Sequence, residues 1–192
     1  MVYTELSPNP NSMKFVLNFE LVPDGLSFDY PTPASTAEEN KESPLASDLF
    51  QFAFVKRVFI ASNFITLTKE DETAWEDVLY DLKKFMKIYF DENHPVFAPK
   101  TIDKNSVVVS ENDSEIVGKI KTVLDQYVRP AVESDGGAIN FASFDEISGQ
   151  VKVYLQGSCS GCPSSTITLK NGIENLLKNM VPEVKEVIAE GV

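Results

Sequence analysis

The sequence contains few of the residues that usually bind metals or stabilise small secreted domains. Its 192 residues include two cysteines and one histidine. Two cysteines are too few for a secreted disulfide framework, and an intracellular cysteine pair is more often metal-binding or redox-active. A single histidine cannot supply the nitrogen ligands that complete many zinc sites. Any metal or redox chemistry is therefore expected at the two thiols.

Positive charge is also scarce. The chain has 17 lysines and arginines against 29 acidic residues, a formal net charge of −12. Residues 1–100 contain 9 basic and 16 acidic groups, and residues 101–192 contain 8 and 13, so neither half is basic. Because phosphate groups bind clustered lysine and arginine, we expect no nucleic acid or anionic membrane partner.

Long apolar runs are absent as well. No stretch of about 18 apolar residues occurs, so the sequence predicts no membrane span. The first 15 residues, MVYTELSPNPNSMKF, have no basic n-region, no apolar h-region and no enrichment in arginine. From these absences we expect a cytoplasmic protein.

The residues that are present are typical of folded domains. Hydrophobic residues make up 43% of the chain and include 13 phenylalanines, enough for packed cores. The segment ENHPVFAPKTIDKNS has two prolines and little periodicity, as an inter-domain linker does. We therefore predict two small domains, residues 1–92 and 112–192, joined by a linker over residues 93–111.

The first half has the pattern of strands packed under one amphipathic helix. Residues 2–6 and 13–18 are candidate strands around the turn SPNPNS. Residues 23–44 predict a polar loop followed by a short helix, and residues 57–69 predict a hairpin that turns near Ala61–Asn63. From Asp71 to Asp91, apolar residues recur with helical spacing.

The second half has a clearer pattern. Residues 116–128 form a helical stripe that Pro130 should kink or end. Two strands, AINFASF and QVKVYLQG, follow and are joined by a turn near Ser148-Gly149. A helical stripe over residues 167–180 and a last strand, VKEVIAE, complete the chain. The order helix, strand, strand, helix, strand predicts an α+β fold for this domain, and both domains together are α+β.

Both cysteines lie in one loop, GSCSGCPSST, between a predicted strand and a predicted helix. Pro163 suits the first helical position, so the free N–H groups of the first turn point back at Cys159 and Cys162. A helix N-terminus favours the thiolate form that binds metal or attacks disulfides. The neighbouring Gly and Ser residues are small and leave room for an inorganic cluster or a partner chain.

Three interpretations of this CxxC loop remain open: a metal site, a redox-active pair and inert packing. A thioredoxin-like active site also has CxxC at a helix start, but no βαβ crossover is evident in the pattern. A metal site needs four ligands, and the chain offers only Cys159 and Cys162 with a distant His94. Two chains around a twofold axis would supply four thiolates, which suit iron–sulfur or zinc.

Longer stretches resemble a known family. VRPAVESDGGAINF, VKVYLQGSCSGCPSSTITLKNGIENLLK and VPEVKEV cover most of residues 114–188 and resemble the C-terminal domain of NifU, as found in Nfu-type iron–sulfur scaffold and carrier proteins. SPNPNSMKFVLN, SPLASDLF, VKRVFIASNFITLTK and the helix from Trp75 are similar to the Nfu N-terminal domain.

The resemblance implies a non-enzymatic iron–sulfur scaffold or carrier. Cys159 and Cys162 would ligate a cluster, usually [4Fe–4S], that bridges a homodimer and passes to apo-proteins. The expected partners are apo iron–sulfur client proteins and cluster-assembly proteins. A thioredoxin-like thiol–disulfide oxidoreductase module is the alternative function, and a zinc-bridged structural dimer is a third.

Four further residues have simpler expected roles. Gly136 and Gly137 should give their turn its positive φ angles. We expect Trp75 in a hydrophobic core and His94 in the linker.

Overall fold

The structure of the chain is a computed structural model. It describes every residue except 1, 24, 38–41, 100–113, 161–162 and 192, and in residues 163–166 it describes the backbone alone. Contacts divide the chain into two compact units, Met1–Val107 and Val108–Val192. Helices and strands occur in both, which confirms the α+β class.

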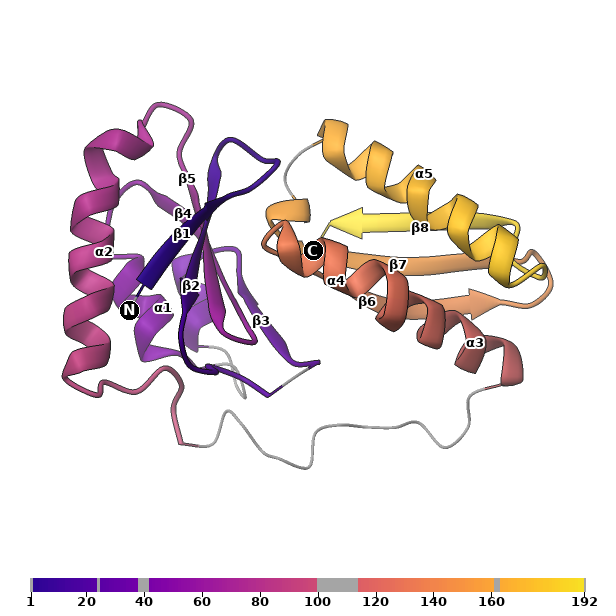
Figure 1. Ribbon diagram of the computed structural model, residues 1–192, viewed down its shortest axis with the longest axis horizontal. Helices are drawn as coiled ribbons and strands as arrows, with labels where there is room; N and C mark the ends of the chain where they lie inside the picture. Colours follow the sequence, from indigo (N-terminus) through magenta and orange to yellow (C-terminus); the bar gives the residue numbers. More distant parts are fainter. Residues whose placement is uncertain (1, 24, 38–41, 100–113, 161–162, 192) are drawn as a thin grey trace. The chain divides into compact units, whose positions relative to one another are not determined.

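The N-terminal unit is built on a five-stranded antiparallel sheet (Figure 1). The spatial order is β1-β2-β5-β4-β3, so the predicted hairpin β4–β5 lies inside the sheet. Along β2, β4 and β5, residues of one face belong to the hydrophobic core, as period-two alternation requires. The strands are β1 (Val2–Leu6), β2 (Ser12–Leu17), β3 (Ser27–Tyr30), β4 (Val55–Ala61) and β5 (Phe64–Lys69).

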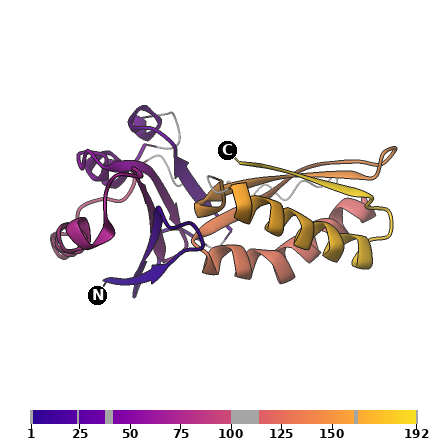
Figure 2. The same ribbon diagram turned by 90° about the horizontal axis from the view of Figure 1, so that it is seen from above.

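Helices α1 (Pro44–Leu49) and α2 (Trp75–Asp91) lie on one face of this sheet (Figures 1 and 2). The Ser43 side chain caps α1 by accepting a 3.1 Å hydrogen bond from the Ala46 amide. Leu82 and Met86 of α2 are fully buried against the strands. The predicted amphipathic helix thus supplies one layer of the core, and the sheet supplies the other.

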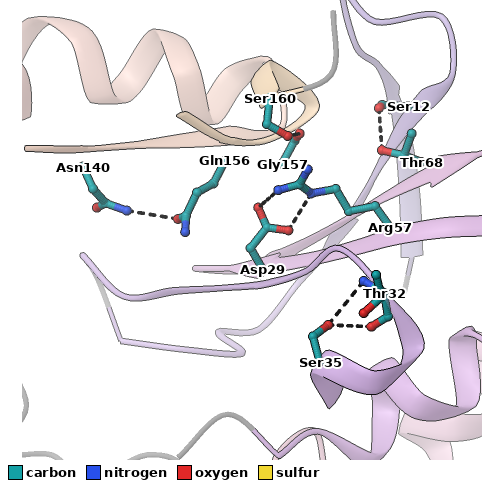
Figure 3. A network of polar contacts seen from close by, with 10 residues as sticks. All are labelled: Ser12, Asp29, Thr32, Ser35, Arg57, Thr68, Asn140, Gln156, Gly157 and Ser160. Atoms are coloured by element: carbon teal, nitrogen blue, oxygen red, sulfur yellow. Dashed lines mark hydrogen bonds and ion pairs between the residues drawn. The ribbon is translucent and has the colours of Figure 1, made fainter. Parts of the chain in front are cut away.

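Residues 23–44 were predicted as a loop, and this prediction was wrong. They contain the edge strand β3 and a 3₁₀ helix, η1 (Pro33–Ala37). β3 has four residues, too few for a recognisable alternation, and it is fixed by contacts distant in sequence. Asp29 in β3 accepts two 2.7 Å hydrogen bonds from the guanidinium of Arg57 in β4 (Figure 3).

The segment after α2 packs on the N-terminal unit. Phe97 is buried in its core, and the Ala98 amide donates a 2.9 Å hydrogen bond to the Glu42 carbonyl. The Tyr89 hydroxyl donates a 2.7 Å hydrogen bond to the Pro95 carbonyl. The first part of the predicted linker, residues 93–111, is therefore bound to this unit, whereas residues 100–113 lie outside the described part of the chain.

The C-terminal unit is built on a three-stranded sheet of order β6-β7-β8. β6 and β7 form an antiparallel hairpin with a bulge between Phe141 and Ser143, and β7 and β8 are parallel. Val151, Val153 and Leu155 are fully buried on one face of β7, as the predicted alternation requires. The strands are β6 (Gly137–Asp145), β7 (Gln150–Gly157) and β8 (Glu186–Gly191).

Helices cover one face of this sheet (Figure 2). They are α3 (Glu115–Val123), the π-helical turn η2 (Leu124–Val128), α4 (Arg129–Ser134) and α5 (Pro163–Met180). Pro130 was expected to kink or end the first helix, and the α-helical hydrogen bonding of α3 does end at Val123, gives way to the π-helical η2 and resumes in α4. Pro130 stands at the start of α4, where its missing N–H leaves little unsatisfied.

Candidate cysteine site

Cys159 lies in a 3₁₀ turn, η3 (Ser158–Ser160), between β7 and α5. The sequence predicted this strand-to-helix position, and the structure confirms it for Cys159. Its side chain is 7% exposed and belongs to the hydrophobic core of the C-terminal unit. Cys162, the other predicted ligand, lies outside the described residues.

Three hydrogen bonds fix the turn that holds Cys159. The Ser158 hydroxyl donates to the Asp135 carbonyl at 2.6 Å, and the Ser158 amide donates to the Gly136 carbonyl at 3.3 Å. The Ser160 hydroxyl donates to the Gly157 carbonyl at 3.1 Å (Figure 3). The turn after α4 and the turn after β7 are therefore bound to each other, although 23 residues separate them in sequence.

Glycines make room for the sulfur. A Cβ atom on Gly137 would lie 2.8 Å from the Sγ atom of Cys159 and 2.6 Å from the Gln156 carbonyl oxygen, closer than such atoms approach. Gly137 pairs directly with Gly157, the last residue of β7. Gly136 and Gly157 have φ angles of 83° and 65°, so both adopt the left-handed conformation. The expected positive φ is thus confirmed for Gly136 and wrong for Gly137, which instead provides space.

The end of β8 also contacts this turn. A Cβ atom on Gly191 would lie 2.6 Å from the Ser160 carbonyl oxygen. Three segments therefore surround the cysteine turn closely: the turn at residues 135–137, the end of β7 and the end of β8. Sequence spacing predicted the loop itself, but these long-range contacts gave no signal in the sequence.

The described residues provide no complete metal site. No group of three or more His, Cys, Asp or Glu side chains that could hold a metal ion occurs among them. His94 lies beside Glu92, with 2.9 Å between its Nε2 and a Glu92 carboxylate oxygen, and its ring is next to that of Tyr89. Because Cys162 lies outside the described residues, a site that includes both cysteines stays a prediction.

One argument against a redox site does not hold. No βαβ crossover was expected around the cysteines, yet β7 and β8 are parallel and α5 connects them. The sequence could not reveal this pairing, because the direction of β8 depends on its partner strand rather than on its own pattern. The local topology is therefore compatible with both metal binding and thiol exchange.

Trp75 and Arg129 have structural contacts. Trp75 packs at the edge of the N-terminal core, and its indole N–H donates a 3.0 Å hydrogen bond to the Pro10 carbonyl. Arg129 forms an ion pair with Asp125 one helical turn earlier.

Within the described chain, no helix is long and apolar enough to span a membrane.

Comparison with known proteins identifies the family. Residues 120–188 match the NifU-like domain, and residues 2–93 match the N-terminal domain of the scaffold protein Nfu/NifU. The chain belongs to this Nfu/NifU family, which confirms the resemblance found in the sequence.

Two relatives show the extent of the similarity. NifU-like protein 4, mitochondrial, of Arabidopsis thaliana is 39% identical over 98% of this chain and 65% of its own length. The human NFU1 iron-sulfur cluster scaffold homolog, mitochondrial, is 41% identical over 97% of this chain and 70% of its own. The chain thus spans about two thirds of the length of these relatives. The family is one of scaffold proteins rather than enzymes, in agreement with the prediction from the sequence.

A solved structure is less similar. A crystal structure of a Staphylococcus aureus protein is 24% identical and covers 44% of this chain and 96% of its own, with a TM-score of 0.36.

The predicted cytoplasmic location is contradicted by these relatives, which are named as mitochondrial proteins. The prediction relied on the composition of the first 15 residues. In the structure residues 2–6 and 12–17 form β1 and β2 of the N-terminal sheet. Their composition is therefore determined by folding and is no guide to the compartment.

Proposed function

We propose that this chain holds an iron–sulfur cluster through the thiolates of Cys159 and Cys162 and transfers the cluster to apo-proteins. Membership of the Nfu/NifU family supports the general function, an iron–sulfur scaffold. The observation that carries the assignment to these residues is the position of Cys159, in the turn between β7 and the long helix α5. Thiolates are soft ligands that suit iron–sulfur clusters.

The cluster, which we propose is [4Fe–4S], bridges two copies of the chain. Its four irons take four cysteine ligands, and one chain has two cysteines. A twofold axis through the cluster would present the same pair from each copy. Because neither copy holds the cluster alone, it is released more easily than a cluster enclosed by one domain. Such a site suits delivery to apo-protein clients after loading by cluster-assembly proteins.

The buried position of Cys159 adds a step to this function. Because Cys159 is only 7% exposed, its sulfur must turn outward before it can share a cluster with a second copy. The hydrogen bonds of Ser158 and Ser160 oppose this movement, at about 1 kcal/mol net for each bond. Thiolate coordination contributes far more, on the order of 10 kcal/mol for structural zinc sites. Binding the cluster therefore opens the turn, and closing the turn again favours transfer.

Anaerobic reconstitution with iron and sulfide tests the proposal. Mössbauer spectra and iron and sulfide analysis should give four of each per two chains, and the loaded protein should activate an apo-enzyme that requires [4Fe–4S]. Cys159→Ser and Cys162→Ser should each abolish the cluster, whereas the exposed α1 variant Ser47→Ala should retain it. Circular dichroism checks that the variants fold. Full cluster content in either cysteine variant would contradict the proposal.

The same preparations test the alternative, a thiol–disulfide oxidoreductase. That function requires reversible formation of a Cys159–Cys162 disulfide and turnover of a disulfide substrate. We expect insulin reduction by the wild type to equal that of the Cys159→Ser/Cys162→Ser double variant. Turnover above the double variant would favour the alternative.

A further inference from the structure

The exposed surface of α5 carries little charge, although the chain is strongly acidic. One of its described exposed side chains is charged, namely Lys178. By contrast, six of the eight exposed residues of α2 are charged: Glu76, Asp77, Asp81, Lys84, Lys87 and Asp91. A helix that faces only water in a chain of net charge −12 would be expected to resemble α2.

The charges of α5 lie to one side of its exposed surface. Lys170, Glu174 and Lys178 are spaced four residues apart and so share one stripe of the helix. Glu174 accepts a hydrogen bond from the Val187 amide of β8 at 3.1 Å and pairs with Lys178. This stripe therefore borders the sheet and leaves a separate outer stripe without charge.

We call this outer stripe the amide face. It consists of Ile167, Thr168, Asn171, Gly172, Asn175 and Asn179, all exposed. Ile167 is 61% exposed and gives this otherwise polar stripe one large apolar side chain. A Cβ atom built on Gly172 would have no neighbour within 4 Å, so another backbone could approach closely there.

The amide face begins beside the proposed cluster ligands. α5 starts at Pro163, directly after Cys162. Ile167 is four residues further, about 6 Å along the helix axis at the usual helical rise. If four thiolates from two chains bind one cluster, the first turns of both α5 helices must come close to each other. The amide face then continues from the bridging site along α5.

We propose that the amide face packs against the amide face of a second copy in the cluster-bridged dimer. This inference rests on the proposed function, because the cluster brings the two helices together. Asparagine amides both donate and accept hydrogen bonds, so the same face can pair with itself across a twofold axis. Ile167 adds apolar contact, and the absence of acidic groups avoids repulsion between two chains of charge −12 each.

The size of the face explains why this dimer depends on the cluster. Stable interfaces use about 20–30 residues on each side. Six residues form a much smaller contact, which adds to the cluster–thiolate bonds but does not replace them. The protein without its cluster is therefore expected to show no dimer that depends on this face.

A charge-reversal experiment on the full-length chain tests the contact. Asn171→Glu and Asn171→Lys each place like charges opposite each other in a symmetric dimer, whereas an equimolar mixture pairs opposite charges. After anaerobic reconstitution, sedimentation velocity should show the dissociation constant of each single dimer raised roughly tenfold or more. The mixture should return to within about threefold of the wild type.

Ile167→Glu should also weaken the dimer, and Ile88→Glu on the exposed surface of α2 is its matched control. The control should dimerise as the wild type does. Wild-type dimerisation in both Asn171→Glu and Ile167→Glu would overturn the inference, and so would a mixture as weak as its two components. A wild-type protein that binds a cluster only as a monomer would instead overturn the proposed function.

Discussion

The two units treat their buried polar atoms in different ways. In the N-terminal unit a buried carboxylate, Asp29, is paired with Arg57 through two 2.7 Å hydrogen bonds. In the C-terminal unit the sulfur of the buried Cys159 lies beside the backbone of Gly137, and the hydroxyl of the buried Ser158 donates to the Asp135 carbonyl. The N-terminal unit pairs two charged side chains with each other, whereas the C-terminal unit has a glycine, which has no side chain, next to the cysteine. The ion pair fixes a strand, whereas the cysteine turn is the part that must open in the proposed function.

The largest effect is expected when the ion pair is broken. Arg57→Met would leave the Asp29 carboxylate, whose side chain is 5% exposed, without its main partner. Removing one partner of a buried pair typically costs about 3–5 kcal/mol. Chemical denaturation of the N-terminal unit should show this loss. The cluster content after reconstitution should not change, because both proposed ligands lie in the C-terminal unit. A large fall in cluster content would contradict this independence of the cluster site from Arg57.

The next largest effect is expected at Gly137. Gly137→Ala forces a Cβ atom against the Cys159 sulfur and the Gln156 carbonyl, and overpacking of this kind costs about 1–3 kcal/mol. Gly118→Ala in α3 is the matched control, because a Cβ atom there meets nothing within 4 Å. Because alanine favours a helix interior over glycine, Gly118→Ala should raise the free energy of unfolding by roughly 1 kcal/mol. Equal effects of the two changes on the free energy of unfolding would contradict the account of Gly137.

Tyr89 provides a smaller test in the N-terminal unit. Burial, with a contribution from the nearby charge of Asp48, raises the pKa of Tyr89 to about 12 from its ordinary value of 10. The raised pKa means that the folded state favours the neutral hydroxyl. The contribution of Tyr89 to the free energy of unfolding is therefore complete below pH 10 and is lost as the pH rises towards 12.

Tyr89→Phe removes both the titrating hydroxyl and its hydrogen bond to the Pro95 carbonyl. The loss of the hydrogen bond should lower the free energy of unfolding by about 1 kcal/mol near neutral pH. Denaturation at several pH values between 9 and 12 should therefore show a steeper loss of stability in the wild type than in the variant. Parallel pH profiles would contradict the raised pKa of Tyr89.

The smallest effect is expected at Glu174 in the C-terminal unit. A hydrogen bond from Lys178, followed by one from the Val187 amide, lowers the pKa of Glu174 below its ordinary value. A carboxyl group whose pKa is lower in the folded state stabilises the fold at pH values above its unfolded-state pKa. This stabilisation is lost as the pH falls through its folded-state pKa. Glu174→Gln should therefore cost less than about 1 kcal/mol at pH 7. The difference from the wild type should become smaller in denaturation curves as the pH falls below the ordinary carboxyl pKa value of 4.5.

Local features of the sequence predicted most helices and strands. The stripe before Asp91 became α2, and the two runs around Ala61–Asn63 became a hairpin, because both patterns depend on neighbouring residues. The strand β3 was missed because Asp29 is fixed by Arg57, which lies 28 residues away. The parallel pairing of β7 and β8 was missed for the same kind of reason.

The candidate site was predicted only in part. The spacing of the cysteines and Pro163 placed Cys159 correctly between a strand and a helix. Its burial could not be predicted, because it depends on contacts with Gly137 and with the turn at residues 135–136. These contacts depend on the pairing of β6 with β7.

Native mass spectrometry of the anaerobically reconstituted protein tests the central claim most directly, because it reports chain number and cluster content in one particle. The account predicts a species of two chains and one [4Fe–4S] cluster, and chains without a cluster at the mass of a monomer. A cluster retained by a single chain, or a dimer that persists unchanged when the cluster is removed, would contradict it.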